Sequence, residues 1–434
     1  MSKNGTSEEL QQVLKYIESY WGEIIIPPEK HENNPDFLDV PYTYIVPNTG
    51  QYKYLFYWDS YFIFQGLLGT SQEWVIPEMV ENFSYLLKNF RIIPNLNHYS
   101  SLNRTQPPLF TSMIFNAYDV LKRNEHVSSI MKKQVTNVDN WLRVHIQLAQ
   151  QEYKDVWHSR IGTYTYNHHV IDYQLNRYGN RDSGDAYYSE FESGWDTTSR
   201  FYNRCNEFLP VDLNCFLYKY EKDFAKASHI LGQEKEMHYW EEIASERKKR
   251  ITTYMWNEKK GFYYDYDFIH KKQSEFNSLA GFVPLWAGIA TEEQAQRVRK
   301  KLPLFETAYG LAVTDEQSLA PVINLSNIPE SYKIAVEYSL QPKQWDYPHI
   351  WSPLEYLSVI GLLQYGFIDD AKRIMGKAIA ANIAVYKKYG ALLEKLDATT
   401  GGAARDFHYP NQFGFGWTNA VVYRYTELLK SLEN

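Results

Sequence analysis

The sequence predicts an all-α protein in which about twelve helices, taken in consecutive pairs, form a closed double ring. Apolar residues recur at three- and four-residue spacing along most of the chain, which is the pattern of amphipathic helices. Only one short stretch, 262–267, has a β pattern, and we expect it to be one arm of a small hairpin insertion. No linker or composition break divides the 434 residues, so we expect a single domain over 1–434.

The first half of the chain supplies five predicted helices, at 7–22, 59–69, 73–90, 109–123 and 125–151. In the first of them, Leu10, Val13, Leu14 and Ile17 form one apolar face. Gly69 is a good stop for the second. Polar loops are expected at 91–108 and at 152–191.

The second half begins with a helix that starts near Pro210, with Asp212 as the expected N-cap, and ends at Gly232. Further helices are predicted at 234–256, 278–288, 291–302, 330–339, 354–365, 369–388 and 417–432. The long loops between helices should gather on one rim of the ring, where functional residues usually lie on a rigid scaffold.

Charge and hydropathy exclude two classes of partner. The net charge is -7 and no basic block could follow a phosphate backbone, so we expect no nucleic acid partner. No apolar run approaches the roughly 18 residues that a membrane helix needs, so we expect no membrane partner. The first residues lack the apolar core of a signal peptide, and a cytoplasmic location is the expectation.

The composition points to a small, amphipathic ligand. The chain has 37 Tyr and 12 Trp, and such side chains join an apolar face to a polar tip, which favours a carbohydrate substrate. The two cysteines, Cys205 and Cys215, fit neither a disulfide framework nor a zinc site. His168 and His169 are interpreted as solvated loop residues. We therefore expect no metal and no cofactor, and the sequence also contains no nucleotide-binding fingerprint.

Five loops are rich in Trp, Asp, Asn, Arg and Gln: 51–62, 94–108, 192–201, 344–353 and 394–419. One such loop alone is explained by a buried tryptophan or an ordered turn, whereas five in one helical chain favour a binding site. The loop at 192–201 combines Glu192, Trp195 and Asp196. Aromatic rings stack on the apolar face of a sugar, and a carboxylic acid can protonate a glycosidic oxygen.

These loops resemble the motifs of the trehalase family of inverting glycosidases, in the family's order. The matching segments are YWDSYF at 57–62, RTQPP at 104–108, ESGWD at 192–196, QWDYP at 344–348 and GFGWTN at 414–419. The resemblance runs from about 48 to 425 and implies an (α/α)6 barrel. It implies an inverting hydrolase acting on trehalose or a related small α-glucoside.

The resemblance also implies roles for matching positions. Asp196 matches the catalytic acid, whose pKa should be raised, and Trp195 beside it is suited to raising it. Trp58, Asp59, Asn97, Arg104, Gln106, Trp345 and Asp346 match sugar-binding or site-supporting positions.

The sequence departs from the family at the base. The base glutamate should lie six residues before Gly414, where this chain has His408, while Asp406 two residues earlier could supply a carboxylate. Glu394 is a third carboxylate, but it matches a position that is not the base. Positions where the family carries an Arg, a Glu and an Arg hold Gln51, Tyr54 and His98, and Arg177 or Arg181 could restore one cationic clamp.

Two other functions stay open. In an inverting phosphorylase, phosphate replaces the water and its base, and His408 with Arg405 could hold the anion. A sugar-binding protein without activity would keep the scaffold and lose the base. Both would leave the acid, Asp196, in place.

Overall fold

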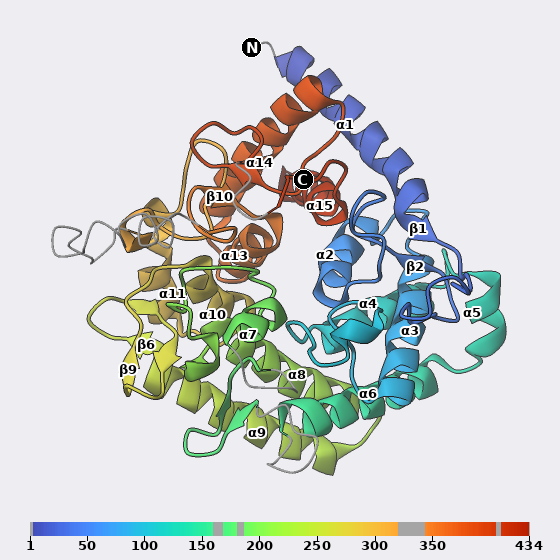
Figure 1. Cartoon of the computed structure of the whole chain (residues 1–434), viewed down its shortest axis with the longest axis horizontal. Helices are drawn as coiled ribbons and strands as arrows, with labels where there is room; N and C mark the ends of the chain where they lie inside the picture. The colour runs from blue at the N-terminus through green and yellow to red at the C-terminus, as the bar shows by residue number, and fades with distance from the viewer. Residues whose placement is uncertain (1–2, 159–167, 180–185, 320–342, 405–408, 434) are drawn as a thin grey trace.

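The computed structural model describes residues 3–158, 168–179, 186–319, 343–404 and 409–433. Its centre is a closed inner ring of helices, each in contact with the next: α2 (Tyr57–Leu67), α4 (Phe110–Arg123), α8 (Val211–Ile230), α10 (Val283–Trp286), α13 (Ser352–Gln364) and α15 (Gly416–Glu433). The ring closes because α15 packs against α2, so that the end of the chain lies beside its beginning (Figure 1).

An outer ring covers the inner one. It consists of α1 (Lys3–Ile24), α3 (Val75–Phe90), α6 (Val138–Glu152), α9 (Glu234–Met255), α11 (Glu292–Arg299) and α14 (Ile368–Tyr389). Helix α3 packs on α4, α9 on α8, and α14 on both α13 and α15, while α1 contacts α14 and α15. Six inner and six outer helices make an (α/α)6 barrel, which confirms the predicted fold class (Figure 1).

The helix sequences explain which ring each helix joins. All eleven residues of α2 are buried, because this helix is apolar on nearly every face. Helix α9 is highly charged and buries a single stripe that includes Trp240, Ala244 and Ile251. Most buried apolar side chains form one cluster that runs from Val13 in α1 to Tyr425 in α15, and a second, smaller cluster includes Ile350 and Leu396. Among the described helices, none is both long enough and apolar enough to span a bilayer.

In the part of the chain that the structure describes, every strand is two residues long and lies in a connection between helices. The pairs are β1 (Ile25–Ile26) with β2 (Tyr44–Ile45), β3 (His169–Val170) with β4 (Leu175–Asn176), β6 (Trp256–Asn257) with β7 (Phe262–Tyr263), and β10 (His349–Ile350) with β11 (Leu396–Asp397). A three-stranded sheet joins β5 (Phe208–Leu209), β8 (Tyr266–Asp267) and β9 (Lys272–Gln273). The predicted β stretch at 262–267 is therefore confirmed as strand, but it is split between a hairpin and this sheet.

Three predictions about the helices were wrong. The helix predicted at 125–151 is two helices, α5 (Ser129–Gln134) and α6, because the Asn137 side chain accepts a hydrogen bond from the Asn140 N–H (2.8 Å) and starts α6 anew. The loop predicted at 152–191 includes a π-helical turn at Tyr153–Trp157 and the helix α7 (Ala186–Glu192). Asp212 does not cap α8, since the helix begins one residue before it. The helix predicted at 330–339 lies outside the described residues.

Candidate active site

Five tryptophans from four of the predicted loops meet inside one end of the ring. The indoles of Trp345 and Trp351 are stacked, with centroids 4.0 Å apart, and Trp345 also lies 5.7 Å from both Trp58 and Trp195. Trp417, at the start of α15, completes the cluster 6.3 Å from Trp58. All five side chains are buried. The faces of the five indole rings therefore mainly contact one another. Together they form an apolar floor that brings the loops together.

Asp346 joins its own loop to the one that carries Asp196. Its Oδ1 accepts hydrogen bonds from the Ser199 N–H (2.9 Å) and the Thr198 hydroxyl (3.0 Å). Its Oδ2 accepts from the Ser199 hydroxyl (2.6 Å) and the Lys343 N–H (2.9 Å). With four donors on a fully buried carboxylate, Asp346 supports the site through the backbone of 196–199.

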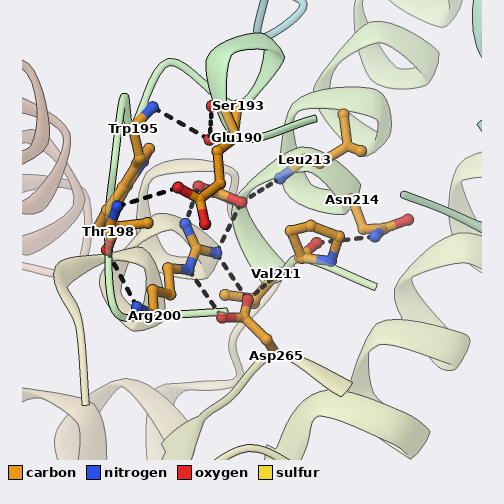
Figure 2. A network of polar contacts seen from close by, with 11 residues as sticks. Glu190, Ser193, Trp195, Thr198, Arg200, Val211, Leu213, Asn214 and Asp265 are labelled. Carbon is orange, nitrogen blue, oxygen red and sulfur yellow. Dashed lines mark hydrogen bonds and ion pairs between the residues drawn. The ribbon is translucent and has the colours of Figure 1, made fainter. Parts of the chain in front are cut away.

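Arg200 anchors the same loop to Asp212 and Asp265. Its guanidinium makes two hydrogen bonds to Asp212 (2.7 and 2.9 Å) and two to Asp265 (2.8 and 2.7 Å). Figure 2 shows the guanidinium reaching toward Asp265 beneath the segment that carries Trp195 and Thr198. The guanidinium carbon lies 4.5 Å from the centre of the Trp195 ring. A buried cation with two carboxylates thus fixes the indole beside Asp196.

Asn97 and Gln106, from the loop at 94–108, hold the backbone around Trp58. Gln106 Oε1 accepts a hydrogen bond from the Trp58 N–H (3.0 Å), one of the N–H groups at the start of α2 that no helical carbonyl can satisfy. The Asn97 amide accepts from the Leu55 N–H (2.7 Å) and donates to the Leu38 carbonyl (3.1 Å). Both amides therefore bind main-chain groups here.

Glu192 ties three segments together at the C-terminal end of α7. One carboxylate oxygen accepts from the Thr105 N–H (3.0 Å), and the other contacts the Gly179 N–H (2.6 Å) and the His168 ring (2.7 Å). The interpretation of His168 as a solvated residue was wrong, since its ring is fully buried and also bonds the Val156 carbonyl (2.9 Å). In the described part of the chain, no group of His, Cys, Asp or Glu is arranged to hold a metal ion.

Three carboxylates, Asp59, Asp196 and Glu394, interact electrostatically at this end of the ring. Burial, with smaller contributions from the charges of Glu394 and Glu190, raises the pKa of Asp196 to about 8 against the opposing effect of Arg104. Burial also raises the pKa of Asp59 well above its usual range, with Asp196 and Glu394 as additional causes. Among the described residues, the Asp196 carboxyl has no hydrogen-bond partner. A pKa of about 8 favours the protonated form of Asp196 at neutral pH, and its oxygens are left available for a ligand.

Arg104 is the cation that faces Asp196. Burial lowers its pKa, and attraction to Asp196 and Glu192 partly restores it. Its guanidinium lies 5.9 Å from the ring centres of both Tyr188 and Phe191 in α7, and it donates to the Asn103 side chain (3.0 Å). A desolvated arginine beside the Asp196 carboxyl can donate hydrogen bonds to hydroxyl oxygens of a ligand.

Glu394 lies against the tryptophan cluster. Its side chain accepts hydrogen bonds from Lys395 Nζ (2.9 Å) and from the Tyr409 hydroxyl (2.9 Å), while its backbone carbonyl accepts from the Trp417 indole (3.0 Å). Burial raises its pKa, and Lys395 opposes the shift. Sequence reasoning set Glu394 aside because it matches a family position that is not the base. The only available signal was a Glu-Lys pair inside one of the five loops.

Of the remaining sequence candidates, some lie outside the described residues and others have contacts that the structure shows. Asp406 and His408 lie outside the described residues, as does Arg181. Gln51 is exposed and accepts from the Gln412 amide (3.2 Å), and Tyr54 packs edge-on to His98 with ring centres 5.6 Å apart. Arg177 donates to the Asn206 carbonyl (2.7 Å), beside Cys205 and Glu192.

Comparison with known proteins agrees with this geometry. A family model described as trehalase matches residues 1–430. A probable trehalase of Eremothecium gossypii is 29% identical over 443 aligned residues, which cover 88% of this chain and 57% of that protein. The chain thus spans little more than half the length of that relative.

Solved structures give the same result. A neutral trehalase from Saccharomyces cerevisiae superposes with a TM-score of 0.73 at 25% identity, covering 96% of this chain and 80% of that one. A mannosylglycerate hydrolase from Thermus thermophilus shares the fold, with a TM-score of 0.64 at 15% identity over 95% of this chain and all of that one. Because the family model covers nearly every residue, this protein belongs to the trehalase family of glycoside hydrolases.

Proposed function

We propose that this protein hydrolyses the α-glucosidic bond of trehalose or a related small α-glucoside, with inversion at the anomeric carbon. The observation that carries the proposal is the state of Asp196. Its pKa is raised to about 8, and among the described residues no hydrogen bond occupies its carboxyl. A carboxylic acid that stays protonated at neutral pH is what a leaving glycosidic oxygen requires.

In this proposal Asp196 donates its proton to the glycosidic oxygen as the bond to the anomeric carbon breaks. Arg104 and Asp59 bind hydroxyl groups of the sugar on either side of the acid. Trp58 and Trp345 form part of the apolar floor beneath the sugar. Trp195, Asp346, Asn97 and Gln106 act on the site by holding these groups in place, which their buried contacts support. Correct positioning of this kind contributes heavily to glycoside cleavage.

Inversion also needs a group that takes a proton from the attacking water on the opposite side of the sugar. The two carboxyl groups of an inverting enzyme stand roughly 6.5–9.5 Å apart to leave room for that water. The sequence register nominates Asp406 or His408 for this role. Neither is among the residues that the structure describes.

The test is to incubate the purified protein with trehalose and a panel of small α-glucosides and to follow the released sugar by proton NMR. We expect a β-configured product at first, and Asp196→Asn should abolish its release. Full activity in Asp196→Asn would overturn the assignment of the acid. A strict requirement for inorganic phosphate would instead identify a phosphorylase. Tight sugar binding in calorimetry without any turnover would identify a binding protein.

A further inference from the structure

Glu394 and Tyr409 form a hydrogen-bonded pair on the same side of the ring as Asp196. The Tyr409 hydroxyl donates to one oxygen of the buried Glu394 carboxylate at 2.9 Å. We propose that this pair is the proton acceptor of the reaction, with the Tyr409 hydroxyl taking a proton from the attacking water and passing its own to Glu394. The inference rests on the proposed function and names the group that the sequence register left open.

Lys395 keeps Glu394 ready to accept a proton. The ammonium group is completely buried and lies 2.9 Å from the second carboxylate oxygen, so an ionised Glu394 has a counter-charge in a dry environment. The same ammonium lies 4.4 Å from the centre of the Tyr409 ring. One lysine therefore holds both members of the pair, and the Glu394 oxygen that faces Tyr409 is the one placed to receive its proton.

The pair lies close enough to the acid to interact with it electrostatically. Glu394 raises the pKa of both Asp196 and Asp59, so its charge acts on the acid directly. Tyr409 also feels the charge of Asp196, and its side chain is partly exposed whereas Glu394 is not. In the proposed relay, water approaches the pair from the partly exposed tyrosine, and the fully buried carboxylate receives the proton through it.

The step balances without any further reactant. One O–H bond of water breaks as a new O–H bond forms on the Tyr409 oxygen, and the original Tyr409 proton moves to Glu394. The water oxygen forms a bond to the anomeric carbon while the glycosidic C–O bond breaks, and Asp196 gives its proton to the leaving oxygen. Afterwards Glu394 is neutral and Asp196 is ionised, and proton exchange with solvent restores both.

Five titratable groups interact with Glu394 or its relay: Lys395, Tyr409, Tyr52, Asp196 and Asp59. Of these, Tyr52 packs edge-on to Tyr409 with ring centres 5.9 Å apart. Because the acceptor must be ionised, activity should fall on the acidic side as Glu394 takes up a proton. Loss of the acceptor should remove this acidic limb of the pH profile.

Tyr409→Phe is the decisive variant, because it removes only the relay hydroxyl and keeps the buried ion pair of Glu394 and Lys395. We expect kcat to fall by about 100-fold or more, with KM changed by less than about threefold. Glu394→Gln should lose a similar factor and the acidic limb of its pH profile. In Glu394→Ala, azide should restore turnover as a β-glycosyl azide, because azide attacks without giving up a proton.

Glu152 and Tyr220 provide a matched control. This glutamate is also fully buried and accepts a tyrosine hydroxyl at 2.9 Å, but it has no interaction with Asp196 among the described contacts. Burial raises the pKa of Glu152 to about 8, so Glu152→Gln imitates its neutral form. We expect Glu152→Gln and Tyr220→Phe to keep the kcat and the pH profile of the natural protein.

The outcomes separate this inference from the proposed function. If Asp196→Asn is inactive while Tyr409→Phe and Glu394→Gln keep kcat and the acidic limb, the relay is wrong and the hydrolase assignment stands. Loss of the acidic limb in Asp406→Asn or His408→Asn alone would likewise overturn the relay. If the natural protein cleaves none of the glucosides, the proposed function itself fails.

Discussion

Gly194 lies directly against the indole ring of Trp58. A Cβ atom built on Gly194 would stand 2.7 Å from both Cε2 and Cζ2 of that ring, closer than real side chains approach. The backbone φ of Gly194 is +74°, a conformation that residues with a side chain rarely adopt. The loop that carries Asp196 therefore reaches α2 only because position 194 has no side chain.

Gly194→Ala should consequently damage both stability and activity. The added methyl must displace the indole or the loop, and the positive φ adds about 1 kcal/mol of strain to an overpacking cost of about 1–3 kcal/mol. We expect a loss of about 2–4 kcal/mol in the free energy of unfolding, measured with urea, and a fall in kcat of about 100-fold.

Gly69→Ala is the control for this variant. Gly69 has a similar φ of +82°, but nothing lies within 4 Å of its added Cβ. It should show the backbone strain alone, with normal kcat. Equal effects of the two variants on kcat would mean that contact with Trp58 does not position Asp196.

Asp346→Asn should disturb the same loop from the other side. One of the two oxygens becomes an NH2 group, which then faces donors such as the Ser199 hydroxyl or the Lys343 N–H. Leaving buried donors without an acceptor costs about 1–3 kcal/mol. We expect kcat to fall by at least about tenfold as Asp196 loses its position.

Ser199→Ala gives a graded comparison for Asp346→Asn, because it removes one of the four hydrogen bonds and leaves the charge intact. Its kcat should lie between those of the natural protein and Asp346→Asn. If instead Ser199→Ala were the more damaging of the two, the carboxylate would not be the group that joins the loops.

Much of this arrangement could be predicted from the sequence, because it depends on local pattern. Helices with an apolar face, such as α3 and α14, follow from residue spacing, and so does the burial of α2, where nearly every residue is apolar. The five polar loops could be picked out by their composition. That the loops carrying Trp58, Trp195 and Trp345 would come together followed from the prediction that the long loops gather on one rim.

The rest depends on contacts between residues far apart in the chain. His168 is buried because Glu192, 24 residues later, accepts its hydrogen bond, and no local pattern reports that pairing. Glu394 became a candidate for the site only through its hydrogen bond with Tyr409, 15 residues away. The break before α6 did have a local signal in Asn137, but the apolar spacing on both sides outweighed it. Alternatives such as Asp406 and His408 cannot be ranked by sequence spacing alone.

Arg200→Lys should strongly destabilise the protein although it keeps the charge. A lysine ammonium cannot reproduce four planar hydrogen bonds to Asp212 and Asp265, nor stack on Trp195. We expect the free energy of unfolding to fall by about 3–5 kcal/mol, as when a buried ion pair is broken.

Arg373→Lys is a matched change on the surface. Arg373 also pairs with a carboxylate through two hydrogen bonds, to Glu306 at 2.8 and 2.9 Å, but its side chain is 44% exposed. We expect it to cost about 1 kcal/mol or less. Similar losses in the free energy of unfolding for both substitutions would contradict the view that Arg200 stabilises the protein strongly because it is buried.

The pKa of Asp196 predicts how activity and stability respond to pH. The acid must be protonated to donate, so kcat should fall as the pH rises through about 8. Burial raises the pKa of this carboxyl in the folded protein from its ordinary value of 3.8, which makes the unfolded chain release the proton first. The contribution of Asp196 to stability is therefore greatest below about pH 4 and decreases steadily between pH 4 and 8.

The amide that Asp196→Asn introduces has no proton to release in this pH range, so the variant should be the more stable protein at neutral and alkaline pH even though it is inactive. Each unit of the pKa shift corresponds to about 1.4 kcal/mol, and we expect a gain of at least that size at pH 8. Urea unfolding of both proteins at pH 5 and pH 8 measures it, with the difference larger at pH 8. A gain that shrank as the pH rose would mean that the Asp196 carboxyl is ionised in the folded protein, and its role as a proton donor at neutral pH would then be untenable.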